Sequence, residues 1–143
     1  MSADGSRTAE LLGYGGLIPF VGLSLCLIFG WEIDGLSNRS LLVGYAVTIL
    51  SFLGAVHWGF AVAAPDSHSS RDFVASVVPP LLAWVVLALK SPADLLALVL
   101  AFPAWFIWER AGIMARYPDW FRRLRAILTI VVTISLASVV AFA

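Results

Sequence analysis

The sequence predicts an all-α integral membrane protein: a bundle of five transmembrane helices with its N-terminus in the cytoplasm and its C-terminus outward. Of its 143 residues, 61% are apolar and 13% are charged, whereas soluble domains have roughly 45–50% apolar and about 25% charged residues. The apolar residues form five runs close to the length of about 20 residues that a helix needs to cross a bilayer. Five spans use nearly the whole chain, so residues 1–143 are expected to form a single transmembrane domain with little room for a soluble catalytic domain.

The first predicted span covers residues 9–31. Its glycines and Pro19 would weaken a helix in water, but in lipid small residues allow helices to approach one another closely. No obvious small-residue cleavage site follows this apolar run, so we expect a retained helix rather than a signal peptide.

The second predicted span, residues 40–64, carries a row of small side chains. Because they recur at helical spacing, they share one face, and this face is expected to pack against another helix. We call this row the small-residue seam, and its helix-packing residues are Gly44, Ser51, Ala55 and Gly59.

The third and fourth predicted spans are residues 72–89 and 92–110. Pro79 and Pro80 fall within the third span, where they are expected to bend or locally break the helix. The fourth span begins with Ser-Pro-Ala-Asp at residues 91–94, a strong helix-start signal. The turn between these two spans is therefore expected to be very short.

The fifth predicted span covers residues 119–142 and begins as an amphipathic helix. Its first turns place aromatic and apolar residues, including Trp120, on one side and three arginines on another. Such a segment is typical of the membrane interface. Arg122, Arg123 and Arg125 are therefore predicted to lie at the membrane surface and contact anionic lipid.

The distribution of basic residues sets the predicted orientation. Basic residues favour the cytoplasmic side of a membrane. The side of the N-terminus is predicted to hold seven of them and the opposite side two, namely Arg7, Arg71, Arg110, Arg116, Arg122, Arg123 and Arg125 against Arg39 and Lys90. The expected location is the bacterial inner membrane, or the inner mitochondrial membrane in a eukaryote.

His57 is the one ionisable residue well inside a predicted span, roughly 10 Å from the cytoplasmic end of its helix. An intramembrane histidine is a candidate for ligand binding, proton transfer or metal ligation. A neutral structural histidine, bonded to a serine or to a carbonyl freed by a proline, is the open alternative. The functional interpretation predicts a polar pocket at the cytoplasmic interface, suited to the headgroup of a quinone, lipid or similar amphiphile and formed by His57, Trp58, Asp72, Glu109 and Arg110.

The sequence shows no recognisable catalytic or metal-binding set. The second histidine needed for bis-histidine haem is missing from the spans, because His68 lies in a polar loop. Paired metal-ligand motifs, a phosphate-binding glycine loop and a serine nucleophile with a nearby base are also absent, and Cys26 stands alone. The net charge of zero gives no reason to expect nucleic acid as a partner.

Three segments carry a resemblance to a known family: LGYGGLIPF at residues 12–20, SFLGAVHWG at 51–59 and PDWFRRLR at 118–125. With these motifs the chain resembles domain-of-unknown-function family 3429, a proteobacterial family of small multi-span membrane proteins with a mitochondrial relative. The resemblance covers nearly the whole chain and implies an inner-membrane location, but it supplies no established activity. The six tryptophans are also similar in number to those of the porphyrin-binding tryptophan-rich sensory proteins, whose tryptophan-proline motifs do not align here.

Two functions are expected from these observations. The first is a non-enzymatic accessory subunit, or helix-packing partner, of a larger membrane assembly such as a respiratory or photosynthetic complex, or a self-associating protein. The alternative is a protein that binds or transports an amphiphile (a quinone, lipid or porphyrin) around His57, with a bound lipid or quinone as the possible cofactor.

Overall fold

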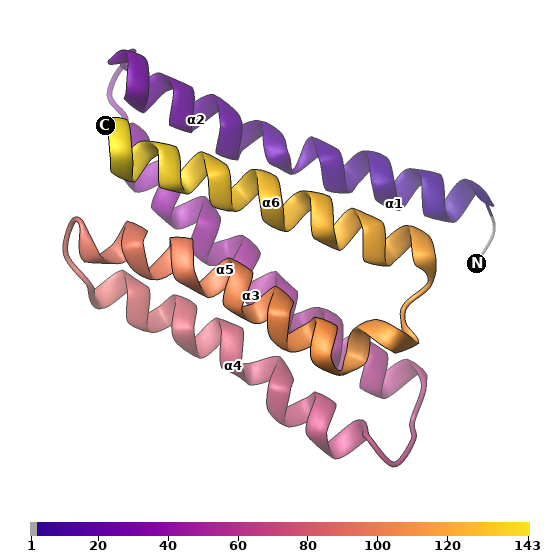
Figure 1. Ribbon diagram of the computed structural model, residues 1–143. Helices are drawn as coiled ribbons and strands as arrows, with labels where there is room; N and C mark the ends of the chain where they lie inside the picture. Colours follow the sequence, from indigo (N-terminus) through magenta and orange to yellow (C-terminus); the bar gives the residue numbers. More distant parts are fainter. Residues whose placement is uncertain (1–2) are drawn as a thin grey trace.

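The computed structural model describes residues 3–143 as an all-helical bundle, so residues 1 and 2 of the predicted domain lie outside the described range. The helices run alongside one another, with α6 between the first helical segment and α5, and α4 beyond α5 (Figure 1). Their bounds are α1 Ala3–Gly15, α2 Leu17–Phe29, α3 Asn38–Ala63, α4 Ser69–Ala88, α5 Ala93–Ala111, the 3-10 helix η1 Ile113–Arg116 and α6 Asp119–Phe142.

The first two helices form one long segment that is interrupted only at Gly16. The Gly16 amide donates to the carbonyls of Leu12 and Gly13 at 2.9 and 3.1 Å, and the Gly16 carbonyl accepts a hydrogen bond from the Tyr45 hydroxyl at 2.8 Å. At the far end, Gly30 has a φ of 68°, a left-handed conformation in which glycine commonly ends a helix.

Four helical segments of the described chain are long and apolar enough to cross a membrane: Ala3–Phe29, Asn38–Ala63, Ser69–Ala88 and Asp119–Phe142. They correspond to the first, second, third and fifth predicted spans. The fourth predicted span, residues 92–110, does form a long helix, α5, beginning at Ala93 as its start signal indicates. It is not among the four candidate spans, because its 19 residues include Asp94, Glu109 and Arg110.

The contact between α3 and α4 depends on a proline and a glycine. The prolines were expected to bend or locally break this helix, but α4 is not broken and continues as one helix through Pro79 and Pro80. Since Pro80 has no N–H, the Ser76 carbonyl has no helical donor at that position. That carbonyl lies against Gly54, where a Cβ atom would be only 2.2 Å from the oxygen. Glycine at position 54 is therefore required for this close approach.

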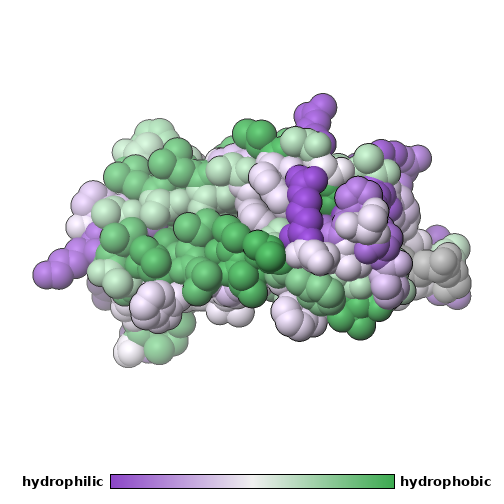
Figure 2. All heavy atoms as spheres, turned by 90° about the horizontal axis from the view of Figure 1, so that it is seen from below, coloured by the Kyte–Doolittle hydropathy of each residue, from purple (hydrophilic) through white to green (hydrophobic). Residues whose placement is uncertain are grey.

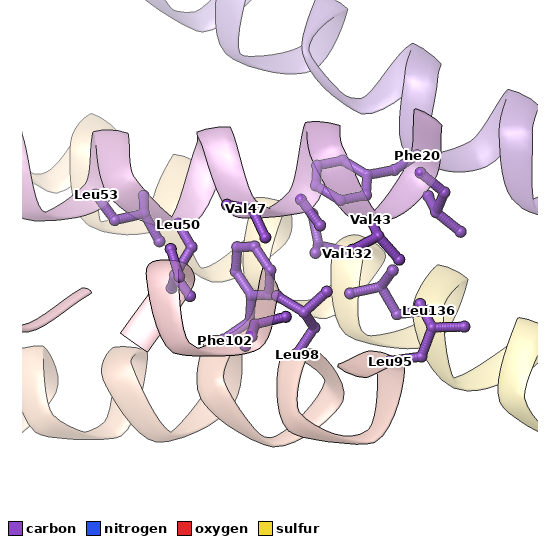
Figure 3. Close-up of a cluster of buried hydrophobic side chains, with 14 of the residues drawn as sticks. Phe20, Val43, Val47, Leu50, Leu53, Leu95, Leu98, Phe102, Val132 and Leu136 are labelled. Carbon is purple, nitrogen blue, oxygen red and sulfur yellow. The ribbon is translucent and has the colours of Figure 1, made fainter. Parts of the chain in front are cut away.

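The hydrophobic core lies where α2, α3, α5 and α6 meet. Figure 3 shows side chains from these helices in this core, including Phe20, Leu50, Leu98, Phe102 and Leu136, all of which are almost fully buried. Many large apolar side chains also lie on the outside, and Figure 2 shows a broad hydrophobic area on one face. An apolar exterior of this extent is expected of helices that face lipid.

Candidate functional site

Three side chains from three helices meet in the interior. The Nε2 atom of His57 in α3 lies 3.0 Å from Oε1 of Glu109 in α5. Arg125 in α6 donates from a terminal nitrogen to Oε2 of Glu109 at 2.5 Å. None of the three is more than 4% exposed. We call His57, Glu109 and Arg125 the buried charge cluster.

The fold brings these residues together through the short connection between α5 and α6. Glu109 lies in the last turn of α5, Gly112 and η1 reverse the chain, and Arg125 follows in the second turn of α6. Thr129, one turn further along α6, accepts a long hydrogen bond of 3.5 Å from Arg125 and donates to the Arg125 carbonyl at 2.8 Å. Glu109 and Arg125 thus face each other across an antiparallel helix pair.

The electrostatics of the buried charge cluster are balanced. An arginine is always charged, so an ionised Glu109 compensates Arg125, as a buried charge requires. The Nε2 atom of His57 lies within hydrogen-bond distance of Glu109, and a carboxylate oxygen can only accept, so the proton of this hydrogen bond belongs to the histidine. The Nδ1 atom of His57 is buried without a hydrogen-bond partner among the described residues.

Two tryptophans of α5 cover the histidine. The rings of Trp105 and Trp108 stack on each other at 4.9 Å and lie 5.2 and 5.6 Å from the His57 ring. Trp105 and Trp108 also line a groove between α4 and α5, which has a volume of about 610 Å³. We call it the α4/α5 groove, and its other apolar lining includes Val74, Val78, Leu82, Ala101 and Ala104.

Arg71, in the first turn of α4, closes one end of the α4/α5 groove. Its guanidinium lies 5.3 Å from the centre of the Trp108 ring, within the range of a cation–π contact. A Cβ atom on Gly112 would lie 3.1 Å from an Arg71 nitrogen, so the arginine lies against the end of α5. In the part of the chain that the structure describes, Arg71 has no carboxylate partner.

A separate ion pair lies beside the groove. Asp72 is 2% exposed and accepts hydrogen bonds at 2.8 and 2.9 Å from one terminal nitrogen of Arg116. The other terminal nitrogen of Arg116 lies 3.4 Å from Asp66. This pair fastens the start of α4 to η1. Tyr117 follows Arg116, and burial raises the pKa of its phenol, with a smaller contribution from the negative charge of Glu109. The Tyr117 hydroxyl therefore remains neutral at physiological pH.

The structure brings together only two of the five residues predicted to form a polar pocket. His57 and Glu109 are in direct contact, but Asp72 is paired with Arg116 instead. Trp58 points outward, where it is 52% exposed and packs 4.9 Å from Phe73. Arg110 is exposed at the end of α5. The predicted five-residue pocket is therefore wrong as a single site.

The predicted contact of Arg125 with anionic lipid is also wrong, because its side chain is buried inside the bundle. Arg122 and Arg123 are exposed and Trp120 is half-buried, but Arg125 is only 4% exposed. On a helix, Arg125 shares a face with Val132, which packs in the core. This spacing is visible in the sequence and would have placed Arg125 inside. The roles of Trp105, Trp108 and Arg71 became visible only from the helix packing.

The small-residue seam faces away from the other helices of the described chain. A Cβ atom on Gly44 or Gly59 would meet nothing within 4 Å, and Ala55 is exposed. Ser51 is half-buried and donates to the Val47 carbonyl of its own helix at 3.0 Å. The expected contact of this seam is thus absent within residues 3–143. Gly54, on the opposite face, makes the close helix contact instead.

Comparisons with known proteins place the chain in a family. The model of a family described as a protein of unknown function (DUF3429) matches residues 5–141. The chain belongs to this family. It is 36% identical to transmembrane protein 69 of Xenopus tropicalis over 93% of this chain, and 26% identical to transmembrane protein 69 of Mus musculus over 92% of this chain.

The chain spans about half the length of these two relatives, 53% of the frog protein and 55% of the mouse protein. The family resemblance seen in the sequence is thus confirmed. Together with the four apolar helices, the relatives show a membrane protein whose helices contact the lipid bilayer. No solved structure matches the chain.

Proposed function

We propose that this protein is a non-enzymatic, five-span inner-membrane protein that binds an amphiphile in the α4/α5 groove. The observation that carries the proposal is an apolar groove that ends at an arginine with no carboxylate partner among the described residues. The groove volume, about 610 Å³, falls in the range of roughly 300–1,000 Å³ typical of ligand sites.

The proposal includes α5 as a fifth membrane span. Its 19 residues extend for about 28 Å, close to the roughly 30 Å thickness of the hydrocarbon core. Two of its charges are compensated, since Asp94 pairs with Arg39 at 2.5 Å and Glu109 with Arg125. The start of α1 and the end of α6 also lie at opposite ends of the bundle (Figure 1), as an odd number of spans requires.

In this topology the N-terminus is cytoplasmic and the Arg71 end of the groove lies at the cytoplasmic interface. An acyl or prenyl tail would lie along Val74, Val78 and Leu82, and the headgroup would reach Arg71. Because a guanidinium binds phosphate with two parallel hydrogen bonds, the headgroup that suits this end is anionic. We therefore propose an anionic phospholipid as the amphiphile.

Quantitative lipid mass spectrometry of the purified protein tests this proposal. The protein is purified in mild detergent from membranes that contain phosphatidylglycerol, and Arg71→Gln is compared with Arg123→Gln, an exposed arginine outside the groove. Loss of a hydrogen-bonded charge pair should lower the retained phosphatidylglycerol about tenfold for Arg71→Gln only. Equal retention by both variants would reject the site.

A second pair of variants tests the tail region of the groove. Val78→Phe fills the groove, whereas Leu87→Phe places the same aromatic side chain on α4 at an exposed position outside it. We expect Val78→Phe to reduce lipid retention and Leu87→Phe to leave it unchanged.

The small-residue seam supports a second candidate function, packing against another membrane subunit or a second copy. Small residues at the helix surface allow close helix contact in lipid, and this seam is not covered within the described chain. If it binds a partner, Gly59→Leu should abolish a complex that purifies with the tagged wild-type protein. A protein recovered alone in every mild detergent would count against this candidate.

A further inference from the structure

A second cavity lies on the other side of the buried charge cluster. It has a volume of about 390 Å³ and is enclosed by the α1–α2 segment, α3 and α6. We call it the α2/α6 cavity. No residue of α4 or α5 lines it, so it is separate from the α4/α5 groove. Its walls are mainly apolar and include Leu17 and Phe20 of α2, Val56 of α3 and Leu128 of α6.

The α2/α6 cavity borders the outer surface of the bundle. Leu12 and Phe52 line it, and these side chains are 72% and 63% exposed. Between α1 and α3 the cavity thus lies next to the side from which an apolar molecule in the lipid phase would enter. The cavity requires no aqueous opening.

Among the residues that the structure describes, Arg125 is the one charged residue in the lining of this cavity. The terminal nitrogens of its guanidinium contact Glu109 and, at 3.5 Å, Thr129. A guanidinium has five N–H groups, so donors remain for a further acceptor. Because the Arg125 side chain is buried, an acceptor in the cavity would take the place of the water molecules that hydrogen-bond an exposed guanidinium.

Charge balance determines the kind of acceptor. Glu109 already compensates the charge of Arg125, so an anionic headgroup would add an uncompensated negative charge between apolar walls. Burying such a charge is strongly unfavourable, whereas an uncharged carbonyl oxygen accepts a hydrogen bond at no such cost. The same reasoning separates this cavity from the α4/α5 groove, where Arg71 has no carboxylate partner among the described residues.

We propose that the α2/α6 cavity binds an uncharged amphiphile whose head carries a carbonyl oxygen, and that this oxygen accepts a hydrogen bond from Arg125. A quinone and a diacylglycerol both have this chemistry. Because Glu109 links Arg125 to His57, the bound ligand also alters the environment of the His57 ring.

Binding measurements in phosphatidylcholine nanodiscs test the proposal. The probes are decylubiquinone and dioctanoylglycerol, and decylbenzene serves as a probe of similar bulk without a carbonyl. At least one carbonyl probe should bind saturably to the full chain and shift the His57 ring resonances in NMR spectra, and decylbenzene should bind about tenfold more weakly. Binding of decylubiquinone alone identifies the quinone class, and binding of dioctanoylglycerol alone identifies the glyceride class.

Two matched cavity-filling variants locate the bound probe without changing a residue of the buried charge cluster, and a third variant changes Arg125 itself. Ala9→Phe fills the α2/α6 cavity and Ala104→Phe fills the α4/α5 groove. We expect Ala9→Phe to weaken binding about tenfold and Ala104→Phe to leave it within about twofold. Arg125→Lys, which keeps the positive charge beside Glu109 but removes the planar donor set, should weaken binding of the carbonyl probe and not of decylbenzene.

Several results would overturn the proposal. These are the absence of saturable binding by both carbonyl probes, equal affinity for decylbenzene, or loss of binding in Ala104→Phe but not in Ala9→Phe. Retention of phosphatidylglycerol is measured separately through Arg71→Gln, so failure of the α4/α5 groove and failure of the α2/α6 cavity give different results.

Discussion

At the scale of single residues, Glu109 links α5 to both α3 and α6. It lies near the end of α5, yet its carboxylate is 1% exposed and contacts side chains of both α3 and α6. Each of its two oxygens has a partner on a different helix. Such a carboxylate acts as a structural link, because a buried charge without its partners is strongly destabilising.

Neutralising Glu109 should therefore destabilise the protein. Glu109→Gln leaves the buried charge of Arg125 uncompensated, and we expect the free energy of unfolding to fall by about 3–5 kcal/mol. Unfolding in mixed micelles, followed by circular dichroism, measures the change. The control is Asp119→Asn, which removes the exposed partner of Arg122 and should cost less than about 1 kcal/mol. A similar small loss for Glu109→Gln would contradict the buried pair.

Arg125 and Asp72 show what sequence reasoning could and could not find at this scale. Helical spacing places Arg125 on the same face as the buried Val132, so its burial was predictable in principle. A basic cluster next to a membrane span favours a place at the membrane surface, and for this reason Arg125 was predicted to lie there. The pairing of Asp72 with Arg116 depends on how η1 folds back against α4, and no local pattern encodes that approach.

At the element scale, α3 and α4 approach closely because a proline in one helix faces a glycine in the other. Pro80 removes the donor for the Ser76 carbonyl, and Gly54 lets that carbonyl come near the α3 backbone. Weak Cα–H···O contacts commonly accompany such close helix pairs. The sequence alone indicated a break in α4 at the prolines, because the compensating contact comes from a different helix.

Substitution of Gly54 tests this contact. The added methyl group of Gly54→Ala would overlap the Ser76 carbonyl, and we expect a loss of about 1–3 kcal/mol in the free energy of unfolding, as in other overpacked interiors. Gly59→Ala is the matched control on the same helix, since its Cβ would meet nothing within 4 Å. The explanation fails if both substitutions have the same effect.

The positions of the helices were largely predictable from the sequence, but the pairing of the charges of α5 was not. Apolar run length and capping signals placed all five long helical segments, because both are local properties of the chain. Whether α5 crosses the membrane depends on how its charges are compensated. Arg39 and Arg125 supply that compensation from other helices. Because these arginines are distant in the sequence from the carboxylates of α5, the pairing could not be predicted from the sequence.

At the scale of the whole molecule, the buried charge cluster lies between two cavities of different character. The α4/α5 groove ends at Arg71, and the α2/α6 cavity is lined by the compensated Arg125. The charge balance at each arginine favours a different headgroup. We therefore propose two distinct places for amphiphiles in the bundle, on opposite sides of one polar interior.

The proposed five-span topology can be mapped with single cysteines. In a Cys26→Ser background, Ser67→Cys in the α3–α4 loop should react with a membrane-impermeant maleimide only from the cytoplasmic side. Ser91→Cys, between α4 and α5, should react only from the outside. Ala143→Cys at the end of the chain should also react from the outside if α5 is a span. Labelling of positions 67 and 143 from the same side would contradict five spans.

Photo-crosslinking with a diazirine-bearing phosphatidylglycerol tests the central claim most directly, because it reports where the lipid lies on the folded protein. After illumination in nanodiscs, peptide mass spectrometry should find the label concentrated at residues 70–82 of α4 and 101–108 of α5, and Arg71→Gln should lower this labelling about tenfold. Labelling spread evenly over the lipid-facing helices, unchanged in Arg71→Gln, would contradict an amphiphile site in the α4/α5 groove.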